Sequence, residues 1–567
     1  MKNKAFFVLL ILAFVASWTN AAAPAATSAE RTGRLGPEAR NVQTRKLAAE
    51  SACGPGQTLR IDPIQAQVTI SAWDQARIAV EAIVEVGDSD PEFIKEFLDN
   101  VKMTIEPETA GLALRFTSPM DWDRRQAGSL GRIGQAIRTG RWNLSYAARV
   151  EVHVPASLSL DVHNRFGNLA VRGVNGRIGL RNESGEVRAD GCGGELKVQN
   201  SFGAVRVVDF KGPADIRSES GEIQAENIAG KTDIRNSFKD IHFAKIGGPL
   251  TVTSESAGVV GSDVAGDCRI TSSFKTIDVR GVQGRLDIAG ESLEVTVDNV
   301  SRDAAIASGY KPIKVTNVKG GLRVIGNSSA IKAEDIGGEA SLKSSFQSIE
   351  AARIHGRLTV EGESLAVTIR DAAKDVDIKS SFKDVLVTGV GGALNVQSQS
   401  AKVTATGVKA GATIKTSFSA VEARNIGRDL KIEGESTAVL AEDIGGAVTV
   451  RNSFKNVTLR GTSGSISVVG ESSSVDIDAI KSLPAGSVID IKTSFMPILI
   501  TLPAGVDFQG TAKTQFGKIN TNTPVSLQNA GSSNGQTVRF DSGTGGVTLK
   551  LETSADITVK KMPANSK

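Results

Sequence analysis

The side chains of this chain that could do chemistry are glutamates that recur at a fixed interval. Each follows the last by 36 residues or a multiple of 36, with Asn327 and Gln399 in the two remaining places: Glu183, Glu219, Glu255, Glu291, Glu363, Glu435 and Glu471. Convergent carboxylates cleave polysaccharides in glycoside hydrolases, which long β-helices also host. That chemistry requires acids brought together by long loops, whereas the chain from Phe166 to Phe454 has almost no insertions. The simpler interpretation is a solvated edge of mixed charge, and the alternative is a ladder matched to a periodic polymer or to divalent ions.

Histidine and cysteine give no sign of a metal or catalytic centre. The four histidines form no metal-spaced pair, and the chain contains no phosphate-binding loop. The three cysteines, Cys53, Cys192 and Cys268, are odd in number and widely spaced, so they are no disulfide framework. Cys192 and Cys268 fall in apolar columns of a repeat, which predicts that they are buried. We expect no catalytic, cofactor-binding or metal-ligating residues, no cofactor and no small-molecule substrate.

Charge gives no reason to expect a nucleic-acid partner. The chain has 66 basic and 62 acidic residues among its 567, which leaves a net charge of only +4. Nucleic-acid binding normally requires a strongly basic face. One basic and aromatic cluster lies within residues 119–146, and it comprises Trp122, Arg124, Arg125, Arg132, Arg138, Arg141 and Trp142. We interpret it as a solvated loop, with a discrete partner site as the alternative.

Two interleaved series of residues reveal the elements that must position these side chains. Steps of 36 residues from Phe166 always reach an aromatic ring: Phe202, Phe238, Phe274, Tyr310, Phe346, Phe382, Phe418 and Phe454. The same steps from Ser184, which lies 18 residues after Phe166, always reach a serine, as far as Ser472. A fixed period is typical of repeat proteins, whose units stack on their neighbours. The structural unit is therefore 18 residues long, and the sequence unit is two of them.

The pattern within each unit indicates strands. Three residues after each ring or serine, seventeen of eighteen positions hold Val or Ile, which favour strands. Ten residues after it, most units have a glycine, which permits a tight corner. Short strands stacked in parallel about 4.8 Å apart form a β-solenoid. The sequence thus predicts an all-β fold, a parallel β-solenoid that winds right-handed, with a small N-terminal α+β cap.

The alternation of ring and serine predicts how the core of the solenoid is filled. Equivalent residues of adjacent coils lie above one another, so a ring in every coil would crowd the core and a serine in every coil would leave a void. The even spacing from Ile234 through Asn236 to Phe238 points the ring in the same direction as the isoleucine. We therefore expect the nine rings from Phe166 to Phe454 to form a buried core ladder. The alternative is a ladder that faces outward and sticks to a partner.

Both ends of the chain differ from the repeat. Lys2, Lys4, the apolar stretch 5–18 and the small residues after it are typical of a secretory signal peptide, with an uncleaved anchor as the alternative. Apolar spacing in residues 89–103 predicts a helix that Ser89 or Asp90 caps. We expect a signal peptide at 1–22, a linker at 23–54, a cap of strands and helix at 55–150, regular coils at 151–480, and irregular coils with closing strands at 481–567.

One stretch, "YAARVEVHVPASLSLDVHNRFGNLAVRGVNGRIGLRNESGEVRADGCGGELKVQNSFGAVRV", resembles a bacterial family of β-strand-repeat proteins that carry an inferred adhesin label. The likeness extends over roughly residues 55–560. It implies a secreted or membrane-attached β-solenoid domain of unknown function, and it implies no catalytic residues. Most turns of this chain read SFK or ES, where the family often has turns of Ser-Gly-Asp type.

These observations favour a non-enzymatic, exported rod with a structural or adhesive role in the cell envelope. We expect it in the periplasm, at the cell surface or outside the cell, with an unidentified surface polymer or protein as its partner. Two alternatives stay open, namely a carbohydrate-active enzyme built on a β-helix and an envelope scaffold or sensor with a protein partner. The oligomeric state does not follow from the sequence.

Overall fold

Two compact units make up the chain in a computed structural model, which describes residues 41–122, 131–139, 144–529, 535–543 and 546–563. The larger unit comprises Lys46–Ile83, Lys102–Thr117 and the chain from Ala148 onward, and the smaller one includes Val84–Val101 and Ser118–Ala147. The expected signal peptide lies outside the described residues. Among the described residues, no helix has the length and apolar character needed to cross a membrane.

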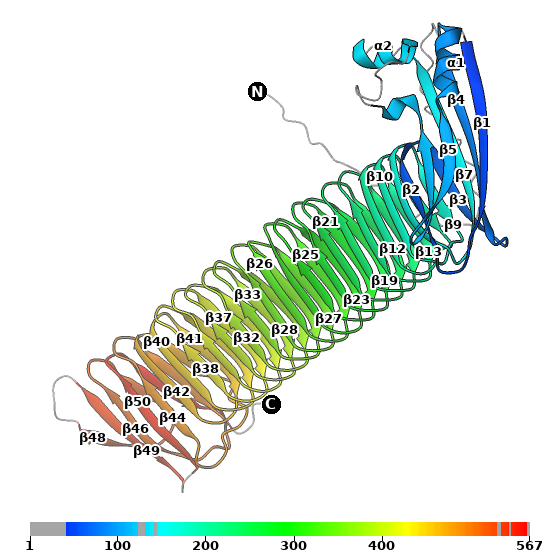
Figure 1. Ribbon diagram of the computed structural model, residues 1–567. Helices are drawn as coiled ribbons and strands as arrows, with labels where there is room; N and C mark the ends of the chain where they lie inside the picture. The colour runs from blue at the N-terminus through cyan, green and yellow to red at the C-terminus, as the bar shows by residue number, and fades with distance from the viewer. Residues whose placement is uncertain (1–40, 123–130, 140–143, 530–534, 544–545, 564–567) are drawn as a thin grey trace, which may run out of the picture. The chain divides into compact units, whose positions relative to one another are not determined.

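The larger unit is a parallel β-solenoid of about 18 coils, which confirms the predicted fold class (Figure 1). Each coil contributes one strand to each of two sheets, and neighbouring coils pair in register 18 residues apart, as Ile216 pairs with Ile234 and Ile223 with Ile241. The spacing follows from the repeat, since a one-coil step brings identical positions together. The right-handed winding stays a prediction.

One sheet of the solenoid holds the strands that lead toward the ring and serine positions. In chain order these are β8 (Ser159–Phe166), β10 (Ile178–Ser184), β12 (Leu196–Phe202), β14 (Ala214–Ser218), β16 (Thr232–Asn236), β18 (Leu250–Ser254), β20 (Cys268–Thr271), β22 (Leu286–Ala289), β24 (Ala304–Gly309), β26 (Leu322–Asn327), β28 (Ala340–Ser344), β30 (Leu358–Glu361), β32 (Val376–Lys379), β34 (Leu394–Gln397), β36 (Ala412–Lys415), β38 (Leu430–Glu433), β40 (Val448–Phe454) and β42 (Ile466–Ser472).

The other sheet begins just after those positions and carries the β-branched column. Its strands are β9 (Leu169–Arg172), β11 (Val187–Asp190), β13 (Val205–Phe210), β15 (Ile223–Ile228), β17 (Ile241–Ile246), β19 (Val259–Val264), β21 (Thr276–Val282), β23 (Glu294–Val300), β25 (Ile313–Val318), β27 (Ile331–Ile336), β29 (Ser348–Ile354), β31 (Ala366–Ala372), β33 (Val385–Val390), β35 (Val403–Val408), β37 (Ala420–Ile426), β39 (Ala438–Ile444), β41 (Val457–Thr462) and β43 (Val475–Asp478).

The core between the two sheets is apolar and is built from columns that run the length of the stack. Every member of the column from Leu169 to Val475 is at most 3% exposed, so the β-branched column forms part of the core. Cys192 and Cys268 are buried as predicted. Burial raises the pKa of the Cys268 thiol to about 12, which keeps it protonated and unreactive at neutral pH.

The N-terminal part contributes strands to the solenoid as well as a small helical unit. Strands β2 (Thr58–Gln65) and β3 (Gln67–Trp73) pair in parallel with β8 and β9, so they stack on the first coil. The smaller unit contains the predicted helix, α1 (Pro91–Asp99), whose N-cap Asp90 accepts backbone hydrogen bonds from Glu92 and Phe93. The other elements of this part are β1 (Asn41–Ala52), β4 (Arg77–Asp88), β5 (Lys102–Glu108), β6 (Gly111–Thr117), η1 (Pro119–Asp121), α2 (Gly131–Thr139) and β7 (Ser145–Pro155).

The C-terminal coils do not stack in sequence order. Their strands are β44 (Val488–Lys492), β45 (Ile498–Leu502), β46 (Phe508–Thr514), β47 (Ile519–Thr521), β48 (Val525–Asn529), β49 (Gln536–Ser542), β50 (Val547–Thr553) and β51 (Ile557–Lys561). Strand β50 lies between β44 and β46, and β51 lies between β45 and β47. Strands β49 and β48 then continue the sheet in antiparallel fashion from β46 and close this end of the stack.

Candidate functional site: an aromatic ladder along one edge

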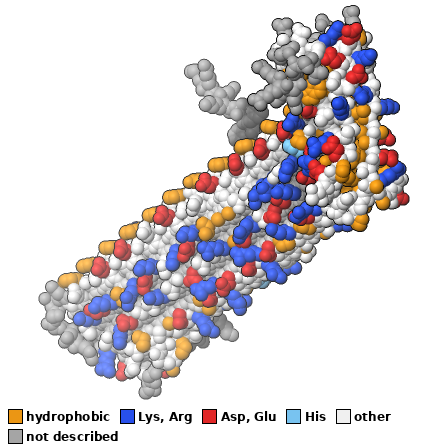
Figure 2. Space-filling view, viewed as in Figure 1, with side chains coloured by type: hydrophobic (Ala, Val, Ile, Leu, Met, Phe, Trp, Pro, Cys, Tyr) orange, Lys and Arg blue, Asp and Glu red, His pale blue; other side chains and the backbone are white. Residues whose placement is uncertain are grey.

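The expected burial of the ring series is wrong, because every ring of the series lies on the surface. The residues concerned are Phe166, Phe202, Phe238, Phe274, Tyr310, Phe346, Phe382, Phe418 and Phe454, and their exposed fractions run from 48% to 73%. Figure 2 shows hydrophobic and acidic side chains alternating along one edge of the solenoid. The outward alternative is therefore the one that the structure supports.

The physical reason is that the chain turns at the ring, because each strand ends either before the ring or, in β8, β12 and β40, at the ring itself. Strand β16 ends at Asn236, and the chain turns through Ser237 and Phe238. The even spacing that predicted an inward ring applies only within a strand, and it fails at the corner. The inward position is taken by Asn236, which is 4% exposed.

A buried polar column holds this corner in place, and sequence reasoning missed it. The Asn236 amide donates hydrogen bonds to the carbonyl oxygens of Gly221 (2.9 Å) in the preceding coil and Lys239 (2.6 Å) in its own turn. The same bond to the coil before recurs from Asn200, Ser272, Ser344, Ser380, Thr416 and Asn452. A small polar residue two places before each ring is the sequence signal that identifies this column. The bond satisfies turn carbonyls that would otherwise be buried without a partner.

Two further rings extend the row beyond the regular repeat. Phe495 and Phe516 are 70% and 74% exposed. Because β50 lies between β44 and β46, Ala555 stands between these two rings in space, and Ser472 stands between Phe454 and Phe495. The order along the edge is thus ring, small residue, ring, small residue, ring, although the 36-residue step fails in the sequence. We call the eleven rings the ring ladder, and the small residues between them the gap positions.

The rings of the ladder do not pack on one another. Successive rings are two coils apart, which corresponds to about 9.6 Å along the stack. Aromatic pairs interact when their ring centroids are about 4.5–7 Å apart, and no pair of ladder rings within the described part of the chain approaches to that range. Each gap position is therefore a small residue flanked along the stack by two rings, and we call the space above it a notch. The notch at Ser364 is spanned by Lys383, whose Nζ donates a hydrogen bond to the Phe346 carbonyl oxygen at 2.7 Å.

Charges also alternate along the ladder. Seven of the ten gap positions are preceded by a glutamate of the series, and all seven, from Glu183 to Glu471, are exposed. Asn327, Gln399 and Ser554 precede the other three. Five ring coils carry an exposed lysine directly after the ring, namely Lys239, Lys275, Lys311, Lys383 and Lys455. About half of the ring coils are thus large and basic at the edge, whereas most gap coils are small and acidic.

These edge charges have few partners in the chain itself. Glu183 lies 3.8 Å from the His163 ring nitrogen Nε2, and the other six glutamates form no ion pair among the described residues. Away from the ladder, by contrast, acids and bases pair repeatedly, as at a second corner of the coil, where Arg353 binds Asp335 through Nε at 2.6 Å and through Nη2 at 2.8 Å. The hydrogen bond from Arg353 lowers the pKa of Asp335 below its ordinary value. Ion pairs thus recur away from the ladder, whereas six of its seven glutamates form none among the described residues; of its lysines, Lys383 donates a hydrogen bond to the Phe346 carbonyl oxygen at 2.7 Å.

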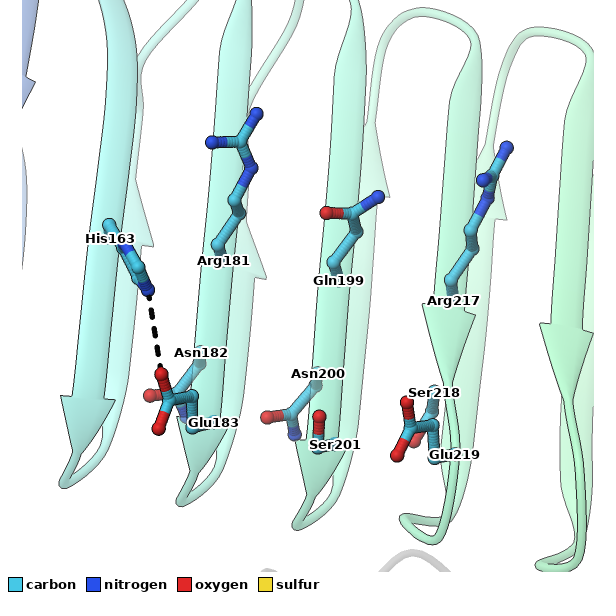
Figure 3. A pocket seen from close by; sticks show the side chains of 10 residues that line it. All are labelled: His163, Arg181, Asn182, Glu183, Gln199, Asn200, Ser201, Arg217, Ser218 and Glu219. Atoms are coloured by element: carbon cyan, nitrogen blue, oxygen red, sulfur yellow. Dashed lines mark ion pairs between the residues drawn. The ribbon is translucent and has the colours of Figure 1, made fainter. Parts of the chain in front are cut away.

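One shallow depression lies beside the ladder near the start of the solenoid (Figure 3). It has a volume of about 460 Å³, and its lining includes Glu183, Glu219, Arg181 and Arg217. A catalytic acid normally needs burial that keeps it protonated, whereas Glu183 and Glu219 are both exposed. Arg217 is already engaged by Asp215 at 3.0 Å. The depression is a polar surface groove that lacks the features of a catalytic cleft.

The remaining candidate residues do not converge on a site. Among the described residues, no group of three or more His, Cys, Asp or Glu side chains is placed to hold a metal ion. In the basic and aromatic cluster, Arg132 pairs with Asp90 and, at 2.7 Å, with Glu92, which indicates a structural role. Arg124, Arg125, Arg141 and Trp142 lie outside the described residues.

The fold and its edge define the chain as a β-solenoid protein with a periodic aromatic and acidic surface. Comparison with known proteins adds no relative: no family model, no curated protein and no solved structure matches the chain.

Proposed function

We propose that this protein is an exported, non-enzymatic rod that docks along its edge, through the ring ladder, to an extended partner with a repeating structure. The observation that carries the proposal is the row of eleven exposed rings, separated by notches and flanked by unpaired charge. Exposed aromatic rows are costly for a solitary protein, because large apolar patches promote association. Their regular spacing along a rigid scaffold supports a contact made of many weak, equal steps.

Several features support a structural or adhesive role over catalysis. The described coils carry no long loops that would assemble a cleft, and the acids at the edge are spread along the axis instead of converging. The resemblance to the bacterial β-strand-repeat family with the adhesin label supports a place in the cell envelope. The charged and apolar start of the sequence supports export.

The test varies the number of rings without disturbing the ends. Deleting residues 275–310 removes one ring coil and one gap coil and joins Phe274 to Lys311, so the register of all remaining coils is kept. Each such deletion should weaken binding of the purified protein to envelope material by a similar factor, as multivalency requires. Binding that does not change with ring number would contradict the proposal.

Two controls distinguish binding through the ladder from non-specific hydrophobic binding and from enzymatic activity. Replacing three exposed apolar residues of the flat faces, Val260, Leu386 and Val469, by serine should leave binding unchanged, whereas Phe202→Ser, Phe238→Ser and Phe274→Ser together should reduce it. Turnover of any polysaccharide in a panel, abolished by one Glu change, would favour the enzyme alternative. Cell fractionation with and without protease shaving tests export.

A further inference from the structure

We propose that the partner of the ring ladder is the ring ladder of a second copy of this chain, in antiparallel orientation and offset by one coil. This inference rests on the proposed function and names its partner. In such a pair each ring of one copy would enter a notch of the other, and the two rods would lie side by side along their edges.

Spacing is the first argument for a second copy. A ring placed in a notch would lie about 4.8 Å along the axis from each of the two flanking rings, which is within the range of favourable aromatic pairs. To fill every notch, the partner must repeat at the distance of two β-coils, which a second copy does by construction. The interleaved rings would then form one continuous aromatic column.

Charge is the second argument. The register that places rings in notches also places ring coils of one copy against gap coils of the other. Lys239, Lys275 and the other ring-coil lysines would then lie at the same level along the stack as glutamates such as Glu219 and Glu255. These glutamates have no ion-pair partner in their own chain within its described part, so the contact would supply one. Size and charge are complementary in the same register, and complementary potentials favour the correct register over its neighbours.

Symmetry selects the antiparallel arrangement. Most homodimers have a two-fold axis, and the same surface then faces itself. A two-fold axis along the stack would place each ring against its own equivalent, with glutamate against glutamate. A two-fold axis perpendicular to the stack reverses one copy and leaves the offset free, so rings can meet notches.

The C-terminal coils provide a further argument. There the sequence repeat is lost, yet Ala555 is placed between Phe495 and Phe516 by a strand inserted out of sequence order. The alternation of ring and notch is therefore a property of the surface itself and extends beyond the sequence repeat. A contact that extends along the whole edge explains why the alternation continues to the end of the stack.

Other partners fit the same surface less well. A lipid surface would accept the phenylalanines, but seven glutamates along the same edge would be repelled by anionic headgroups. A polysaccharide would stack on rings, but phenylalanine lacks the polar tip with which Tyr and Trp also bind hydroxyl groups, and the ladder contains a single Tyr, Tyr310.

The first test uses the full chain and its oligomeric state by sedimentation at micromolar concentration. We expect a dimer. Phe202→Ser, Phe238→Ser and Phe274→Ser together should weaken it about tenfold or more, and the face control with serine at Val260, Leu386 and Val469 should not. Circular dichroism confirms that each variant folds.

A second variant adds apolar surface but removes notches. Ser220→Phe, Ser256→Phe and Ser436→Phe together fill three gap positions. These substitutions should weaken an interleaved dimer, whereas they should strengthen a non-specific hydrophobic association. Tighter association of this variant would overturn the proposal.

Charge reversal tests the register directly. One variant carries Glu219→Lys, Glu255→Lys and Glu291→Lys, and a second carries Lys239→Glu, Lys275→Glu and Lys311→Glu. Each alone should dimerise more weakly than the wild type, and an equal mixture should recover a heterodimer. A mixture that stays as weak as its components would contradict the pairing of ring coils with gap coils.

The outcomes distinguish this inference from the proposed function. A wild-type chain that is monomeric, while its ring variants still lose binding to envelope material, to anionic vesicles or to a polysaccharide, overturns the second-copy inference and leaves the proposed function standing. A dimer that the ring, gap and charge variants all leave unchanged overturns the second-copy inference. If the ring variants also leave binding to envelope material unchanged, the proposed function is overturned as well. Energy transfer between labels on Cys53 of two copies should be low in an antiparallel pair, and high transfer would overturn that orientation.

Discussion

Several ladder rings sit on backbone that folding alone would not favour. Phe274, Tyr310 and Phe346 have φ angles of 65°, 67° and 67°. This left-handed conformation costs a residue with a side chain about 1–2 kcal/mol and is the usual place for glycine. Strained residues concentrate where function requires them. An exposed ring on a strained corner stabilises little in the free chain, which is consistent with a side chain kept for an external contact.

Replacing Phe346 by glycine should therefore not destabilise the protein. We expect Phe346→Gly to raise the free energy of unfolding by up to about 1 kcal/mol, because glycine relieves the left-handed strain. Phe238 has no positive φ angle, so Phe238→Gly should lower it by about 0.5–1 kcal/mol. Urea denaturation at two protein concentrations measures both changes and separates them from self-association. A loss above about 3 kcal/mol at either position would indicate a buried ring.

The buried polar column should be more sensitive than the rings that it positions. Asn236→Ala leaves the Gly221 and Lys239 carbonyl oxygens without the amide that binds them. We expect a loss of about 1–3 kcal/mol in the free energy of unfolding. Ser237→Ala, one residue further along the turn, is the matched control and should change it by no more than about 0.5 kcal/mol. Equal effects of the two substitutions would show that the column does not hold the corner.

At the scale of the coil, the sequence predicted the strands correctly, but it predicted the wrong direction for the ring at the corner. The 18-residue period and the β-branched column were sufficient for the stacked strands, because identical positions must lie above one another. The ring was misplaced because alternation of side chains holds within a strand but not across a turn. A second corner of the coil does have a sequence signal, since Asn227, Asp263, Asn299 and the other non-glycine members of their column up to Asp443 adopt φ angles between 53° and 59°. Asn and Asp tolerate this conformation, so the column could have located the corner.

The glycines that recur ten residues after most rings and serines are needed for a different reason from the tight corner that glycine usually permits. Gly338 has an ordinary φ angle, but a Cβ atom there would lie 2.7 Å from the backbone carbonyl carbon of Gly320 and from the nitrogen of Gly321 in the preceding coil. This glycine is needed for the close approach of stacked coils, and freedom of the backbone is secondary. Such contacts depend on the distance between coils, which the sequence of one coil does not contain.

Adding a methyl group at that glycine should separate two coils. We expect Gly338→Ala to lower the free energy of unfolding by about 1–3 kcal/mol, as overpacking does. Gly54→Ala is the control, because a Cβ atom at Gly54 would meet nothing within 4 Å. Thermal or urea unfolding measures the difference between the two variants. A Gly338→Ala protein as stable as the control would mean that the coils separate without cost.

At the scale of the larger unit, each coil contacts only its neighbours, and stability is transmitted along one dimension. The C-terminal end is an exception to sequence order, because strands β50 and β51 lie between the coils formed by β44 and β45 and by β46 and β47. The last strands of the sequence therefore hold an earlier segment against the stack. They also supply Ala555, which separates Phe495 from Phe516 along the ladder.

Removing residues 547–567 should release the segment that those strands hold. We expect the amides of β46 and β47 to lose hydrogen-exchange protection, because their parallel neighbours are gone and the remaining antiparallel contacts of β46 belong to the same released segment. Protection of coils before Val475 should be unchanged, since nearest-neighbour coupling confines the loss to the end. The internal deletion of residues 275–310 serves as the control, because it shortens the stack and leaves both ends intact. If the C-terminal deletion instead lowered protection back to the coil of Phe238, stability would be cooperative over the whole solenoid, and the ladder would have to be treated as one rigid surface with a single unfolding transition.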